Sequence, residues 1–157
     1  RTVIPVQELL DAAGKYFKKL MKNRSERIEL EIEPMEAKVI GDVNQLRFLL
    51  ENLIDEALTV REDGVIRLQA RKDNEYIRFL FTDTRREKSV EELNQLFYPN
   101  LARMTSGEKG ELRGTEYLVC KQIIRDHDEF AGRRGCRINA EPAEGGGFTV
   151  YFTIPRR

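Results

Sequence analysis

The sequence has few of the features that mark zinc-binding, nucleic-acid-binding or membrane proteins. It contains two cysteines, Cys120 and Cys136, without Cys-x-x-Cys spacing or a histidine cluster, so a zinc site is not expected. Lys plus Arg equals Asp plus Glu at 27 each, so no net charge favours nucleic acid or an anionic membrane surface. No apolar run approaches the roughly 18 residues of a membrane span. These absences predict a soluble, cytoplasmic domain with reduced cysteines, no nucleic-acid partner and no direct insertion into a membrane.

The sequence also has no candidate residues for nucleophilic catalysis. The only histidine is His127, and the sequence shows no Ser/His/Asp or Cys/His arrangement. The sequence therefore does not support an independent hydrolase, and we expect no catalytic residue in this chain.

The length and composition predict one domain. A chain of 157 residues with 40% hydrophobic content is long enough to bury a single core, so we expect one domain over 1–157. The chain starts with Arg1 rather than Met, which suggests the C-terminal part of a longer protein. That longer protein can carry a membrane anchor elsewhere.

Apolar residues at three- and four-residue steps predict three amphipathic helices. Asp42 is expected to cap the second of them, and Ser89 to cap a further short helix with an acidic first turn. The segment 128–135, after the last helix, is expected to be a solvated loop. The four helices are predicted at 6–23, 43–58, 90–97 and 115–127.

Five segments have the composition and the alternation of β-strands, at 27–33, 65–71, 76–82, 136–141 and 148–154. Asp73 and Asn74 suit a tight hairpin turn between the second and third strands. The polar segment 98–113, which holds Gly107 and Gly110, is predicted to be a long functional loop. This order of elements predicts an α+β fold: a two-layer α/β sandwich with helices on one face of a mixed, mostly antiparallel sheet.

Four blocks of the sequence, taken in order, resemble the successive boxes of the ATP-binding catalytic domain of sensor histidine kinases. The resemblance covers nearly the whole chain and implies the GHKL ATPase or Bergerat fold, a role in two-component signal transduction, and a nucleotide lid at 98–113. The blocks are 42–58 (DVNQLRFLLENLIDEAL), 83–99 (DTRREKSVEELNQLFYP), 114–127 (GTEYLVCKQIIRDH) and 137–155 (RINAEPAEGGGFTVYFTIP).

The first two boxes depart from the family pattern. Where the family has N-x-x-x-N, with its later Asn helping to hold Mg²⁺, this chain has Asn52 and Glu56, which the resemblance implies as weak metal ligands. In the D-x-G-x-G box the Asp accepts a hydrogen bond from the adenine amino group, and Asp83 is present. Arg85 and Glu87 stand in place of the two glycines, where their side chains are expected to fill space and any positive φ becomes costly.

The later boxes depart as well. In the G-x-G-x-A box Gly114 keeps the first glycine, but Glu116 replaces the second, and its carboxylate is expected to take the place of a phosphate at the helix N-terminus. Phe148 stands where the family has a small hydroxyl residue near adenine, with Thr149 one position later. By the same resemblance Gly110 belongs to the nucleotide pocket.

Taken together, the departures favour a domain that has kept the fold and lost ordinary ATP binding. We interpret it as a pseudokinase domain without a cofactor that acts through protein contacts, its partners being upstream dimerisation and sensor regions of the same protein and a response regulator. An active ATP-dependent autokinase is one alternative. It would use Mg-ATP and a phosphoacceptor histidine outside this chain. An anti-sigma-like or scaffold module of the same fold is the other.

Overall fold

The computed structural model describes residues 1–99, 105–106, 112–113, 115–132 and 135–157. The main sheet has the strand order β2-β4-β5-β9-β8; β2 and β4 are parallel and the other neighbours antiparallel. The predicted α+β fold with a mixed, mostly antiparallel sheet is therefore confirmed. The strands are β2 (Ile28–Ile32), β4 (Gly64–Asp73), β5 (Tyr76–Asp83), β8 (Ile138–Pro142) and β9 (Phe148–Pro155).

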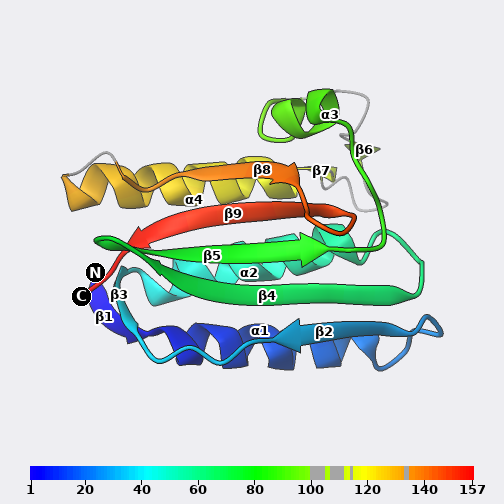
Figure 1. Cartoon of the computed structure of the whole chain (residues 1–157), viewed down its shortest axis with the longest axis horizontal. Helices are drawn as coiled ribbons and strands as arrows, with labels where there is room; N and C mark the ends of the chain where they lie inside the picture. Colours follow the sequence, from blue (N-terminus) through cyan, green and yellow to red (C-terminus); the bar gives the residue numbers. More distant parts are fainter. Residues whose placement is uncertain (100–104, 107–111, 114, 133–134) are drawn as a thin grey trace.

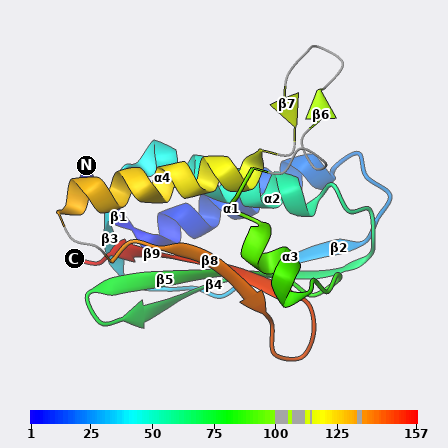
Figure 2. The same cartoon turned by 90° about the horizontal axis from the view of Figure 1, so that it is seen from above.

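Three long helices cover one face of this sheet and make the second layer. They are α1 (Val6–Met21), α2 (Val43–Ala57) and α4 (Glu116–Ala131), and Figure 2 shows all three on the same side of the strands. The short helix α3 (Val90–Gln95) contacts β8 and lies apart from them (Figure 1). The predicted two-layer sandwich is thus the observed arrangement.

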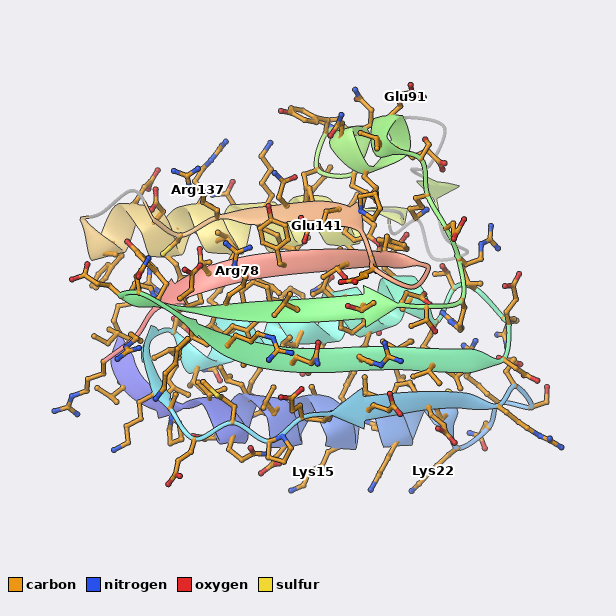
Figure 3. All side chains as sticks on the ribbon, in the orientation of Figure 1. Lys15, Lys22, Arg78, Glu91, Arg137 and Glu141 are labelled. Carbon is orange, nitrogen blue, oxygen red and sulfur yellow. The ribbon has the colours of Figure 1, made fainter. Side chains whose placement is uncertain are left out.

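The core lies between the two layers. Apolar side chains of the three helices and of the inner strand faces are buried there, and the rings of Phe79 and Phe152 stack with centroids 4.8 Å apart. Many charged side chains lie on the outside: Figure 3 shows Arg78 and Glu141 on the open face of the sheet and Lys15 on the side of α1. Within the described residues, no helix is both long enough and apolar enough to cross a membrane.

Both predicted helix caps are confirmed. The Asp42 side chain accepts a hydrogen bond from the backbone N–H of Gln45 at the start of α2. Ser89 and Glu92 form a reciprocal capping box at the start of α3. The hairpin between β4 and β5 turns at Asn74, whose φ of 54° is the kind of left-handed conformation that asparagine tolerates.

One feature was not predicted, and one prediction about the elements is wrong. The feature not predicted is the short antiparallel ribbon of β1 (Thr2–Pro5) and β3 (Lys38–Gly41), which forms a sheet of its own. The loop predicted at 128–135 begins too early, because α4 continues to Ala131 and ends at Gly132 with φ 65°. In the predicted lid, the described residues include two short paired strands, β6 (Thr105–Ser106) and β7 (Leu112–Arg113).

Candidate functional site

The predicted site residues on the sheet come together where β5 ends and β9 begins. Asp83, the last residue of β5, is the cross-strand partner of Phe148, the first residue of β9. The neighbouring pair, Thr82 and Thr149, share a hydrogen bond of 2.7 Å between their buried hydroxyl groups. Because side chains alternate along a strand, Thr149 lies on the opposite face of the sheet from Phe148. Its hydroxyl is thus held by Thr82 and does not line the cavity beside Asp83.

A small cavity lies beside Asp83 and Phe148, under the end of α2. Its volume is about 60 Å³, well below the roughly 300–1,000 Å³ of typical small-molecule sites. Phe148 is buried against it, and the ammonium group of Lys88 lies 5.4 Å from the centre of the Phe148 ring. The lining residues come from α2, β5, α4, β9 and the turns beside them: Glu56, Ala57, Thr59, Val60, Phe81, Asp83, Arg86, Lys88, Tyr117, Phe148 and Val150.

The Arg85 side chain binds both oxygens of the Asp83 carboxylate. The Arg85 side chain folds back on Asp83, so that Nε donates to Oδ1 and Nη2 donates to Oδ2, each over 2.9 Å. The backbone N–H of Arg85 also donates to Oδ1, over 3.0 Å. The pair is almost fully removed from water, with 1% of the Arg85 side chain and 4% of the Asp83 side chain exposed. Asp83 therefore has both carboxylate oxygens engaged by its own chain.

The remaining guanidinium N–H groups of Arg85 reach backbone carbonyls. Nη1 donates to the carbonyl oxygens of Val60 and Glu62, over 3.0 and 2.9 Å. Nη2 donates its second hydrogen to the carbonyl oxygen of Ala57, over 2.7 Å. A guanidinium group has five N–H donors, and here each has an acceptor. This saturation explains how a charged group is held in a nearly dry position.

Two glycines make room for the pair. Gly64 has φ of 145°, and a Cβ on it would lie 2.5 Å from Cγ of Arg85. Gly147 has φ of 84°, and a Cβ on it would lie 2.1 Å from the backbone oxygen of Asp83. Side chains at either position are excluded by space as well as by backbone conformation.

The two residues that replace the family's glycines have different surroundings. The Arg85 side chain is buried against Asp83, but it is not among the residues that line the cavity. Glu87 is exposed and does not line the cavity. Neither residue adopts a positive φ; among the residues that the structure describes, Asn74 is the one non-glycine residue that does. The chain thus accepts both side chains without backbone strain.

On α2, the two predicted metal ligands have different surroundings. The side-chain amide of Asn52 is buried and donates to the carbonyl oxygen of Phe48, one helical turn earlier, over 2.7 Å. Glu56 lines the cavity. In the described part of the chain, no three His, Cys, Asp or Glu side chains gather closely enough to hold a metal ion.

Glu116 brings a carboxylate to the first turn of α4. Its Oε2 is buried and accepts no hydrogen bond from the residues that the structure describes. Burial raises the pKa of the Asp55 carboxyl, and the charge of Glu116 raises it further. The hydrogen bond that Tyr16 donates to Asp55 lowers the pKa in part. Burial and the same charge raise the pKa of the Cys120 thiol. The Glu116 carboxylate thus acts on both Asp55 on α2 and Cys120 on α4, in each case as a lesser cause than burial.

Two predicted site residues, Gly110 and Gly114, lie outside the described residues, as does most of the predicted lid. His127 is described, and it is buried in α4, away from the site. Its Nδ1 bonds the carbonyl oxygen of Ile123 over 2.8 Å, and its Nε2 accepts from the N–H of Asp42 over 3.1 Å. Burial lowers the pKa of His127, in keeping with a neutral imidazole that ties α4 to the start of α2.

The sequence did not reveal which backbone groups take part in the site. The carbonyl groups of Ala57, Val60 and Glu62 carry no side-chain signature, so nothing in the sequence identified them as partners of Arg85. The one available signal was Gly64, at the end of the loop after α2, where a glycine marks a position that another group approaches closely.

Comparisons with known proteins agree with this architecture. The family described as "Histidine kinase-, DNA gyrase B-, and HSP90-like ATPase" matches residues 41–157. No curated protein matches the chain. Among solved structures, the nucleotide-free catalytic domain of the histidine kinase ThkA has a TM-score of 0.75 at 21% identity, over 99% of this chain and 96% of that one.

Two further structures are similar. The mycobacterial sensor histidine kinase MprB has a TM-score of 0.73 at 19% identity, over 99% of this chain and 97% of that one. ThkA in complex with the response regulator protein TrrA has a TM-score of 0.71 at 19% identity, over 99% of this chain and 42% of that one. At these identities the likeness shows a shared fold.

Proposed function

Because the chain belongs to the family of histidine kinase-, DNA gyrase B- and HSP90-like ATPases, we propose that it is the catalytic-type domain of a two-component sensor protein that has kept the fold and lost ordinary nucleotide binding. It acts through protein contacts and not through phosphoryl transfer. On this proposal residues 1–157 form one domain of a longer protein.

The observation that carries the proposal is the buried Asp83–Arg85 pair. In the family that the sequence resembles, the Asp of the D-x-G-x-G box accepts a hydrogen bond from the adenine amino group. Here both oxygens of Asp83 accept from Arg85, and the guanidinium is fixed by three carbonyls besides. A nucleobase would have to displace a charged group with five satisfied donors and leave it without partners, which is strongly unfavourable in a buried site.

The residues at the other end of the site do not fit Mg-ATP either. The first turn of α4, where free N–H groups favour an anion, carries the carboxylate of Glu116. Glu56 lines the cavity from α2. These two carboxylates disfavour a triphosphate, although Arg86 and Lys88 also line the cavity. The base end, where Arg85 holds Asp83, is the part of the site least suited to the nucleotide.

Partners follow from the proposed family role. We propose contacts with upstream dimerisation and sensor regions of the same protein and with a response regulator. The ThkA structure that contains TrrA supports the second, because it shows such a regulator bound to a protein that shares this fold.

Titration calorimetry of the purified wild-type chain with Mg·ATP, and separately with ADP, tests the proposal. We expect no saturable heat up to millimolar ligand, from a protein whose fold is verified by circular dichroism. Saturable binding at micromolar affinity would overturn the proposal and support an ATP-dependent autokinase with a phosphoacceptor histidine outside this chain.

A further inference from the structure

We propose that the Asp83 carboxylate and the carbonyl oxygens of Ala57, Val60 and Glu62 form a guanidinium site, and that Arg85 is its tethered ligand. The inference rests on the proposed loss of nucleotide binding and names the class of ligand that the site takes instead: a monoalkyl guanidinium. When the Arg85 side chain is removed, the site binds a free alkylguanidinium more tightly than adenine.

The first argument is the match of donors and acceptors. The guanidinium site offers two carboxylate oxygens and three carbonyl oxygens, and each accepts one guanidinium N–H of Arg85 over 2.7–3.0 Å. All five are acceptors, so the site suits a group with donors only. Adenine carries a ring-nitrogen acceptor beside its amino donor, and that acceptor would face oxygen atoms. A buried polar group left without a partner costs much of a ligand's affinity.

The second argument is charge. The Asp83 side chain is 4% exposed, so a neutral ligand would leave its carboxylate buried without a counter-charge. A cation is therefore required. An alkylammonium has the charge, but its three donors are not in a plane and cannot reproduce the fork that bonds both carboxylate oxygens.

The third argument is the shape of the space around the alkyl chain. The Cγ of Arg85 passes so close to Gly64 that a Cβ there would lie 2.5 Å from it, and Gly64 has φ of 145°. The space for the alkyl chain thus depends on the glycine at the start of β4. The walls of the guanidinium site are accordingly fitted to a guanidinium on an aliphatic stem.

The guanidinium site has a consequence for the fold. Its acceptors come from the end of α2 at Ala57, from the following turn at Val60 and Glu62, and from the end of β5 at Asp83. Arg85 therefore joins three segments beside the cavity, and because it is covalently attached it is present at a high effective concentration. The arrangement of these walls then depends on no soluble ligand.

Chemical rescue tests the inference. Arg85→Ala is compared with Arg86→Ala, a matched control in which the neighbouring arginine, 52% exposed and 3.4 Å from Glu62, is truncated. The melting temperature of each variant and of the wild type is measured with ethylguanidinium, with ethylammonium, with adenine and without additive. The wild type and Arg86→Ala report the general denaturing effect of the salts.

We expect Arg85→Ala to melt about 10 °C below the wild type, since it leaves Asp83 without its partner. Ethylguanidinium at ten times its dissociation constant should raise that temperature by about 3 °C, while ethylammonium and adenine at the same concentration should raise it less. Equal behaviour of Arg85→Ala and Arg86→Ala with ethylguanidinium would overturn the guanidinium site. Stabilisation of Arg85→Ala by adenine as large as that by ethylguanidinium would overturn its selectivity.

If Arg85→Ala does not fold, two other readouts decide. Recovery of its circular dichroism spectrum by ethylguanidinium supports the guanidinium site, and failure to recover counts against it. In the wild type, NMR should show slow hydrogen exchange at Nε of Arg85 and fast exchange at Nε of Arg86; fast exchange at both contradicts the inference. Nucleotide binding by the wild type would refute the proposed function, whereas failed rescue refutes the guanidinium site alone.

Discussion

His127 and Asp42 are joined by a hydrogen bond although 85 residues separate them: the backbone N–H of Asp42 donates to Nε2 of His127 over 3.1 Å. Gly41 completes the contact, since a Cβ on it would lie 3.0 Å from the same nitrogen. This bond fixes the end of α4 against the start of α2, and it requires an unprotonated Nε2.

The first prediction is therefore a loss of stability on mild acidification. Burial lowers the pKa of His127 in the folded chain below its ordinary value of about 6.5. Below about pH 6.5 the unfolded chain therefore binds more protons than the folded chain. The stability that neutral His127 contributes is complete above that pH, and the free energy of unfolding falls as the pH drops towards the folded pKa. Urea titrations between pH 5 and 8 measure this slope.

The matched control for that experiment is His127→Gln. The sequence contains no other histidine, so the variant should lose most of the slope between pH 5.5 and 7, at a lower overall stability. An unchanged slope in the variant would assign the pH dependence to carboxylates instead.

The second prediction concerns the charge on Asp83. Asp83→Asn keeps the size of the side chain but leaves the Arg85 guanidinium buried without its counter-ion. We expect the free energy of unfolding to fall by about 3–5 kcal/mol, measured by urea denaturation. Asp73→Asn is the control, because it removes an ion pair with Arg78 in which both side chains are 38% exposed. Its cost should stay below about 1 kcal/mol, and similar losses in the two variants would contradict the special position of Asp83.

The third prediction concerns Gly64. Gly64→Ala places a methyl group 2.5 Å from Cγ of Arg85 in a backbone conformation that L-residues rarely adopt. We expect a loss of about 1–3 kcal/mol from backbone strain alone, with a further loss because the Arg85 side chain is displaced. Gly145→Ala, at φ of 88° with no heavy atom near its Cβ position, should show the strain without the clash. Equal losses by urea denaturation would show that Arg85 does not need the space beside Gly64.

The fourth prediction separates the residues that replace glycine. Restoring glycine at Arg85, Glu87 and Glu116 together should raise the affinity for Mg·ATP, since it frees Asp83 and removes a carboxylate from the first turn of α4. Glu87→Gly alone should leave affinity unchanged, because Glu87 is exposed and does not line the cavity. Calorimetry on a triple variant that is folded but gains no affinity would show that these residues are not the block.

The sequence predicted the parts of the fold that depend on local signals. Asp42 and Ser89 were identifiable as caps because a capping side chain bonds an N–H two or three residues away. The ribbon of β1 and β3 was not predicted, since its strands have four residues each and pair across more than thirty residues of intervening chain. The true end of α4 at Gly132 had a readable glycine signal that the prediction did not use.

The site was predictable only in part for a similar reason. The resemblance of residues 83–87 to the family's D-x-G-x-G box led to the expectation that Arg85 fills space that a glycine would leave open. It gave no sign that the guanidinium would fold back on Asp83, since three of its five acceptors are backbone carbonyls of the segment 57–62. Such partners become visible only when α2 and β5 are placed side by side.

The most direct test of the account is a crystal structure of the chain grown or soaked with a high concentration of a non-hydrolysable Mg·ATP analogue. The account predicts the Arg85 guanidinium on the Asp83 carboxylate, with its three carbonyl contacts kept and no nucleobase in the cavity. Arg85 turned out to solvent, with the adenine amino group on Asp83, would contradict it.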